Sequence, residues 1–298
     1  MSSIVASRKS KAASQLPPMR RKQRSAGEIA QRVIAYVFLL VLSAFVLLPF
    51  VWMFLSSLKR NNEIFTAPIT WFPTEWQWVN YLEIWEKSDM GTWLVNTIFV
   101  AVLVTILQVL TGSFAAYGFS RIRFPGRDTL FIIYIATISV PWQAYMIPQF
   151  KFISSLGLVD SLWAIVMLQT FSAFGVFLMK QYYDTIPESL SEAARIDGLS
   201  EYGIYWRIML PLSTAPIASL AIITFTRTWN DYMGPLIYLR RPDIWTIQLG
   251  LQSFVGQYNA DYAAIMTGSV ISVLPIAIVF VIGQRYFVQG IATSGMKN

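Results

Sequence analysis

Residues 33–58 read VIAYVFLLVLSAFVLLPFVWMFLSSL, a run of mostly apolar side chains without a single Asp, Glu, Lys or Arg. Five further blocks free of these four residue types lie at 90–120, 129–150, 161–179, 208–226 and 262–284. Every block has at least 19 residues, and about 20 helical residues cross the hydrocarbon core of a bilayer. Backbone amides in lipid must find hydrogen-bond partners within their own segment. The sequence therefore predicts an all-α polytopic membrane protein with six transmembrane helices.

The composition agrees with this class and excludes several others. Of the 298 residues, 55% are hydrophobic and only 13% are charged, whereas soluble domains carry about a quarter charged residues. Cysteine and histidine are both absent. No disulfide, thiolate nucleophile, zinc cluster or imidazole relay can form within this chain. We expect neither a cofactor nor a metal in the chain, and a membrane enzyme would have few catalytic groups to draw on.

The net charge of +7 comes from the N-terminal segment, because residues 1–32 hold eight Lys or Arg and one acid, Glu28. If the N-terminus is cytoplasmic, 16 of the 23 basic residues fall on the inside of the six spans. That asymmetry predicts a multi-pass protein with both termini in the cytoplasm. The expected organisation is a basic tail over 1–31, a six-span domain over 32–290 and a second tail over 291–298. A signal peptide is not expected, because the first apolar block is too long.

The longest inside loop, residues 180–211, reads KQYYDTIPESLSEAARIDGLSEYGIYWRIMLP. Thr185 and Glu188 have the spacing of a capping box, Gly198 can end a helix in the left-handed conformation, and Ser200 can cap a second helix. The loop is thus predicted to be a helical hairpin leading into the fifth span. The physics of the sequence leaves open whether it is a free surface element or a docking site for a cytosolic protein.

Part of this loop resembles a known motif. Glu192-Ala193-Ala194, then Gly198, then Ile208-x-Leu210-Pro211 match EAA-x3-G-x9-I-x-LP at every fixed position. This is the EAA motif of binding-protein-dependent ABC importers. Over about 30–298 the chain is similar to the smaller membrane subunit of the maltose-type carbohydrate permeases. Besides the EAA motif, the stretches that carry this similarity are 115–126, 228–236 and 284–298. The resemblance implies the type I ABC importer permease fold, in which the hairpin is a cytoplasmic coupling helix.

The resemblance also implies partners and contact residues. A dimer of cytosolic ATPases would grip the hairpin and bind ATP and Mg, and a second, larger permease would complete the pathway. An extracellular or periplasmic solute-binding protein would deliver the sugar, in the cytoplasmic membrane of a bacterium or archaeon. No nucleic acid is expected as a partner. The candidate ATPase-coupling residues are Glu192, Ala193, Ala194, Arg195, Asp197, Gly198, Leu199, Leu210 and Pro211. The tail candidates for the same ATPase are Gly290, Ser294, Gly295 and Lys297, and those for the binding protein are Gln252, Gln257 and Tyr258.

The chain carries no GxxxxGK[ST] motif, so ATP hydrolysis must come from a separate chain. No acidic residue lies inside the predicted spans, which argues against the rival class, an ion-coupled secondary transporter. Arg227 and Asp231 could form an interfacial ion pair or a polar site facing a cavity. The candidate substrate-pathway residues are Gln143, Trp229, Asn230 and Asp231. The sugar assignment follows from the resemblance, and within the same machinery the alternative cargo is glycerol-phosphate or another polyol.

Overall fold

The computed structural model describes residues 26–256 and 260–295, and the side chains of 285–295 are not among what it describes. The chain divides into two compact units, residues 1–51 and residues 52–298. In the described part, the helices are α2 (Ala26–Ser57), α3 (Asn80–Lys87), α4 (Met90–Arg121), α5 (Arg127–Ala136), α6 (Met146–Ser155), α7 (Leu162–Gln169), α8 (Ala173–Tyr183), α9 (Glu188–Ile196), α10 (Glu201–Ile204), α11 (Leu210–Leu212), α12 (Thr214–Trp229), α13 (Met233–Tyr238), α14 (Ile247–Gln252) and α15 (Tyr262–Gly295). Five short turns of 3-10 or π geometry lie between them.

Four segments of the described part are long and apolar enough to cross a membrane: Ile29–Ser57, Met90–Arg121, Leu162–Tyr183 and Tyr262–Gln284. A fifth span results if the bent pair Glu201–Leu212 and Thr214–Trp229 is counted as one, and its two arms meet at 79°. The polytopic helical class is therefore confirmed, with four to five apolar spans.

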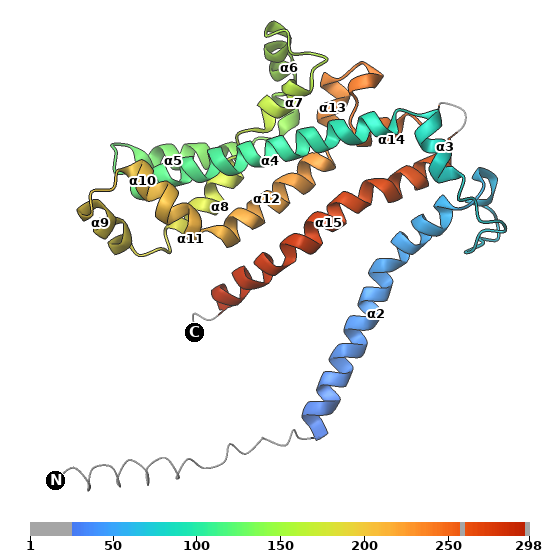
Figure 1. Ribbon diagram of the computed structural model, residues 1–298, viewed down its shortest axis with the longest axis horizontal. Coiled ribbons are helices and arrows are strands. Elements are labelled where there is room, and N and C mark those ends of the chain that lie inside the picture. Colours follow the sequence, from blue (N-terminus) through green and yellow to red (C-terminus); the bar gives the residue numbers. More distant parts are fainter. Residues whose placement is uncertain (1–25, 257–259, 296–298) are drawn as a thin grey trace, which may run out of the picture. The chain divides into compact units, whose positions relative to one another are not determined.

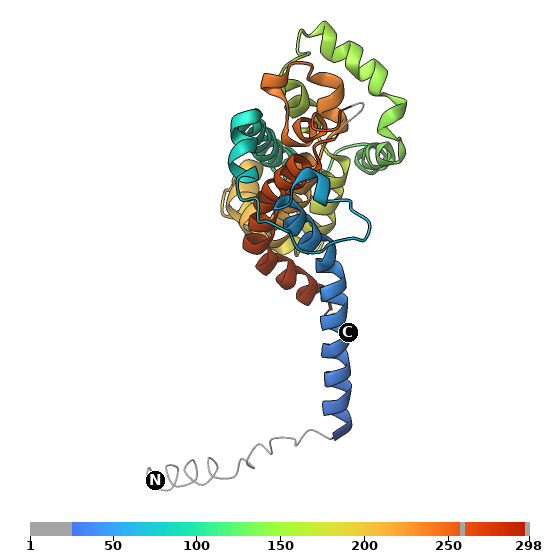
Figure 2. The ribbon, with the colours of Figure 1, turned by 90° about the vertical axis from the view of Figure 1, so that its right-hand side faces the viewer.

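The predicted third span is wrong as a single helix. Residues 129–150 divide into α5, two 3-10 turns and the start of α6, with Pro141 between the turns, and α5 and α6 run in different directions in both views (Figure 1, Figure 2). Proline lacks the N–H that an α-helix needs and clashes with the preceding turn. Helix α5 has 10 residues, or about 15 Å, which is half of a bilayer core.

The fifth apolar block also begins differently from the prediction. Residues Tyr205–Met209 form a π-helical turn, the short helix α11 follows, and the main helix α12 begins only at Thr214. Pro211 and Pro216 fall in this stretch, so the helix cannot run straight through it.

Helix α4 is the centre of the second unit, and α8 and α12 both pack along it, as Figure 1 shows. Helices α4 and α8 pack closely where Gly112 faces Gly175, since a Cβ on Gly112 would lie in van der Waals contact, 3.4 Å from the backbone carbonyl carbon of Gly175. Small residues let membrane helices approach closely enough for dense packing. Helix α15 packs against the other side of α12. This helix packing places polar residues of α4, α7, α12 and α13 around one cavity. It also places the α9–α10 hairpin at the C-terminal end of α4.

Candidate functional site

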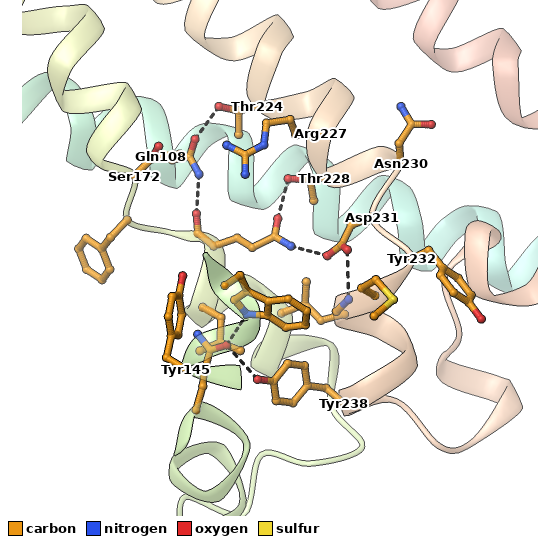
Figure 3. Close-up of a pocket in the computed structure, with 18 residues that line it drawn as sticks. Gln108, Tyr145, Ser172, Thr224, Arg227, Thr228, Asn230, Asp231, Tyr232 and Tyr238 are labelled. Atoms are coloured by element: carbon orange, nitrogen blue, oxygen red, sulfur yellow. Dashed lines mark hydrogen bonds between the residues drawn. The ribbon is translucent and has the colours of Figure 1, made fainter. Parts of the chain in front are cut away.

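A cavity of about 600 Å³ opens between α4, α12, α13 and the segment from the 3-10 turn η3 (Trp142–Ala144) to α8 (Figure 3). This size is within the range of small-molecule sites. Its lining combines aromatic and polar side chains: Gln108, Trp142, Tyr145, Gln149, Ile165, Leu168, Gln169, Phe171, Ser172, Thr224, Arg227, Thr228, Asn230, Asp231, Tyr232, Met233, Gly234 and Tyr238.

One wall of the cavity is the break between α7 and α8. The carbonyl oxygen of Gln169 accepts a hydrogen bond from Gln108 Nε2 at 2.7 Å, and that of Thr170 accepts one from Thr111 Oγ1 at 2.9 Å. Ser172 Oγ then accepts from Gly175 N at 3.1 Å and caps α8. Unwound backbone at membrane depth is tolerated where protein groups replace the missing helical bonds. Side chains of α4 therefore hold this break open beside the cavity.

The side chain of Gln169 connects three elements. Its Oε1 accepts from Thr228 Oγ1 of α12 at 2.8 Å, and its Nε2 donates to Asp231 Oδ2 at 2.7 Å. Nearby, Thr224 Oγ1 donates to Gln108 Oε1 at 2.7 Å. Every polar atom of these two glutamine side chains has a partner, so the network orders the wall.

Asp231 and Arg227 do not share a helical face, because α12 ends at Trp229. The second carboxylate oxygen of Asp231 accepts from Gly234 N at 3.1 Å. Burial raises the pKa of the Asp231 carboxyl above its usual range, against the opposing effects of its hydrogen bonds and of the Arg227 charge. Arg227 is exposed on the wall, and the ion pairs of the described residues do not include it.

The α9–α10 hairpin turns at Gly198, whose φ of +79° lies in the left-handed region, where glycine is favoured. The predicted cap at Ser200 is confirmed, since its Oγ accepts from Gly203 N at 3.3 Å. The predicted capping box is wrong: Thr185 Oγ1 donates to the carbonyl of Tyr182, and Pro187 occupies the N-cap of α9. Because α9 begins after Pro187, Thr185 belongs to the preceding turn and does not cap α9.

An ion pair joins the two helices of the hairpin, and hydrogen bonds connect Glu201 and the following turn to α4. Arg195 Nε lies 2.7 Å from Glu201 Oε1, and Glu201 Oε2 accepts a hydrogen bond from Tyr117 of α4. The hydroxyls of Tyr205 and Ser113 are 2.8 Å apart. These contacts adjoin a buried cluster that contains Ala194, so the hairpin and the end of α4 form one packed body.

The structure places the residues predicted from the motif on two sides of the hairpin. Ala194 is buried at 4% exposure, whereas Ile196 is 86% exposed. Glu192, Ala193, Arg195, Asp197 and Gly198 are exposed, Leu199 and Leu210 are half-buried, and Pro211 is exposed. The outward face of α9 thus combines small and charged residues with the exposed apolar side chains of Leu190 and Ile196.

The four substrate-pathway candidates do not come together. Asn230 and Asp231 line the cavity. Trp229 is fully buried on the opposite side of α12, where its Nε1 donates to the carbonyl of Ser272 at 3.1 Å. Gln143 is exposed and lies outside the lining, although its neighbour Trp142 is part of it.

The other predicted contact residues lie toward the ends of described segments. Gln252 is the last residue of α14, and Gly290, Ser294 and Gly295 belong to the last turns of α15. Gln257, Tyr258 and Lys297 lie outside the described residues.

Comparison with known proteins decides the family. Residues 108–293 match the family described as binding-protein-dependent transport system inner membrane component. The chain belongs to this family. The matched stretch contains both the cavity and the α9–α10 hairpin.

Relatives of this permease match it over most of its length. The arabinooligosaccharides transport system permease protein AraQ of Halalkalibacterium halodurans is 31% identical, over 89% of this chain and 95% of the relative. The sn-glycerol-3-phosphate transport system permease protein UgpE of Yersinia pestis is 28% identical, over 88% and 96%. The permease also shares the fold of a bacterial ABC transporter involved in the import of the acidic polysaccharide alginate. That structure has a TM-score of 0.77 at 24% identity, over 89% of this chain and 99% of the solved one. The chain is thus an ABC importer permease, a transport component and not an enzyme.

Several cavity residues were not among the candidates of the sequence. Gln108, Gln149 and Gln169 are polar residues within apolar blocks of the sequence, whereas Thr224 carried no signal. They converge because α4, α6, α7 and α12 pack together. Polar residues in spans are functional candidates, and that rule would have selected these three glutamines together with Gln143, which lies outside the cavity lining.

Proposed function

We propose that this permease forms half of the translocation pathway for a sugar or oligosaccharide. A solute-binding protein delivers the cargo, and a second, larger permease supplies the other half. The observation that carries the proposal is the cavity, where polar side chains adjoin aromatic rings from Trp142, Tyr145 and Phe171. Sugars are bound by such combinations of hydrogen-bonding groups and flat aromatic faces. The relative described as an arabinooligosaccharides permease supports this cargo class.

The alternative cargo is glycerol-phosphate or another polyol, carried by the same machinery. The Yersinia pestis relative, described as an sn-glycerol-3-phosphate permease, is the observation that supports it. Direct uptake measurements with the assembled importer distinguish the two cargo classes.

The proposed source of energy is a dimer of cytosolic ATPases that bind ATP and Mg and contact the α9–α10 hairpin. The exposed face of α9 supports this assignment, because Ala193 permits close approach of another backbone while Glu192 and Arg195 can set the register. The Arg195–Glu201 pair and its contact with Tyr117 would then transmit a pull on the hairpin to α4. The described C-terminal turns of α15 and the segment after α14 remain candidates for the ATPase and binding-protein contacts.

The proposed topology has six spans, with both termini in the cytoplasm of a bacterial or archaeal cell. The broken segment α5–α6 would be the third span, and it would cross the bilayer as two short helices, one on either side of Pro141. The excess of basic residues on the predicted inside supports the orientation. Labelling of a cysteine introduced at Glu192 from the outside of intact cells would contradict it.

The test of the coupling assignment is ATPase activity stimulated by the loaded binding protein. Glu192→Lys and Gly198→Asp are expected to reduce the stimulated rate to the basal rate while membrane insertion stays intact. Gly198→Asp places a charged side chain on a left-handed residue of the exposed turn. The matched control is Glu86→Lys, a charge reversal at an exposed position on α3. Normal stimulated turnover in both hairpin variants would refute the assignment.

A further inference from the structure

Four side chains of the cavity wall, those of Gln108, Gln149, Gln169 and Asp231, have oxygens that each already accept a hydrogen bond from the protein itself. Asp231 accepts at both carboxylate oxygens, from Gln169 Nε2 at 2.7 Å and from Gly234 N at 3.1 Å. The amide oxygens of Gln108 and Gln169 accept from threonine hydroxyls of α12 at 2.7 and 2.8 Å. The amide oxygen of Gln149 accepts twice, from Trp142 Nε1 at 2.8 Å and from the Tyr238 hydroxyl at 3.1 Å.

The donors of the same wall are not occupied in this way. Among the described residues, the guanidinium of Arg227 makes no ion pair and no side-chain hydrogen bond, and the Nε2 group of Gln149 has no acceptor. The hydroxyl of Tyr145 also has no partner there, and Ser172 Oγ is engaged only as an acceptor. Figure 3 shows Arg227 and Tyr145 among the residues that line the cavity.

Arg227 is exposed on the cavity wall, in the last turn of α12. Asp231, the carboxylate of the lining, lies near enough to feel its charge, but both oxygens of Asp231 accept hydrogen bonds from Gln169 and Gly234, and the two side chains form no ion pair. The guanidinium donors are therefore open to a ligand. Arginine presents a planar fork of donors that matches two oxygens of a carboxylate or phosphate. A neutral sugar hydroxyl carries no charge, so it gains less from the guanidinium of Arg227 than a carboxylate or phosphate does.

We infer that this permease carries a saccharide bearing an oxyanion group, a carboxylate or a phosphate ester, and that Arg227 binds that group. The inference rests on the proposed function and narrows its cargo. The aromatic rings of Tyr145 and Phe171 adjoin the sugar ring, while Gln149 Nε2 and the Ser172 hydroxyl supply further donors. Arg227 is then the residue of this chain that selects acidic over neutral cargo.

The test is direct binding to the purified complex of both permeases and the ATPases, without the binding protein, which has its own selectivity. Saturation-transfer NMR at millimolar ligand detects weak binding. The probes are digalacturonate and its neutral counterpart galactobiose, with glucose 6-phosphate to distinguish a phosphate ester from a carboxylate and inorganic phosphate to detect a bare-anion site. The variants are Arg227→Gln and Arg227→Lys. Arg240→Gln is the matched control, because Arg240 is exposed and lies outside the cavity lining.

In the wild-type complex, digalacturonate or glucose 6-phosphate should bind more tightly than galactobiose. Arg227→Gln should weaken that binding about 10- to 100-fold, the loss expected for a charge-assisted hydrogen bond. Arg227→Lys should retain part of it, while Arg240→Gln and the weak galactobiose signal should not change.

Three outcomes would overturn the inference: equal binding of acidic and neutral probes with no effect of Arg227→Gln, binding of inorganic phosphate alone, or no binding of any saccharide. In each case the proposed function survives if the loaded binding protein still stimulates the ATPase. A complex that responds to no sugar-loaded binding protein refutes the proposed function itself.

Discussion

Replacing Gln108 with methionine should destabilise the helical bundle, because this side chain joins α4 to both α7 and α12. Gln108 is buried at 9% exposure, donates to the Gln169 carbonyl at 2.7 Å and accepts from Thr224 at 2.7 Å. Methionine has a similar length and removes both bonds. A hydrogen bond between membrane helices contributes about 0.6–2 kcal/mol, so the loss of two should cost about 1–4 kcal/mol of unfolding free energy.

A double-mutant cycle isolates the part of this cost that belongs to one bond. Thr224→Val removes the same Thr224–Gln108 bond from the other side. The double variant should be less destabilised than the sum of the single variants, by about 1 kcal/mol, because each single variant already leaves a buried polar group unpaired. The measurement is reversible unfolding of the detergent-purified permease, followed by far-UV circular dichroism in a denaturing-detergent titration.

The control is Thr226→Val on the same helix. Thr226 makes no side-chain hydrogen bond within the described part of the chain, so its replacement should change the unfolding free energy by less than about 0.5 kcal/mol. If Gln108→Met unfolds at the same detergent fraction as Thr226→Val, or if the cycle is additive, the inference that the hydrogen bonds of Gln108 stabilise the bundle is refuted.

Gly250→Ala should destabilise the bundle by about 1–3 kcal/mol, because a Cβ there would lie 2.2 Å from the Trp93 ring. Gly118→Ala on α4 meets nothing within 4 Å and should stabilise by about 0.5–1 kcal/mol; equal unfolding midpoints for the two variants would contradict the packing. For Asp231, burial raises the carboxyl pKa in the folded state. The Asp231 carboxyl therefore contributes stability to the folded state at pH values below its pKa in the unfolded chain. This contribution is lost as the pH rises through its pKa in the folded state. Asp231→Asn should remove this pH dependence, which is measured as the unfolding midpoint at several pH values. An unchanged dependence would show that it comes from another group.

The coarse fold could be predicted because each span is a local property. Twenty apolar residues without a charge have few alternatives to a membrane helix, and the segments at 90–121 and 262–284 appear as expected. Proline has equally local consequences, yet the apolar count over 129–150 outweighed Pro141 in the prediction. The structure breaks there, since a missing N–H and a ring clash act regardless of the hydropathy around them.

At the hairpin, sequence reasoning succeeded where one residue decides the conformation. Gly198 takes positive φ and Ser200 caps α10 as predicted. The pairing of Thr185 with Glu188 failed, because a capping box needs the helix to begin at the threonine and Pro187 shifts that start. Spacing alone did not show where the helix begins.

By itself, the sequence determined that this protein lies in lipid, that its loop over 180–211 turns at Gly198, and that it carries the motif of an importer permease. Only the tertiary structure decided which polar atoms are already paired. Gln169 meets Asp231 and Thr228 across about 60 residues of chain, and Arg227 is left facing the cavity. The physical reason is that hydropathy and helix signals report on neighbours along the chain, whereas hydrogen-bond partners between helices depend on how helices far apart in the sequence pack together.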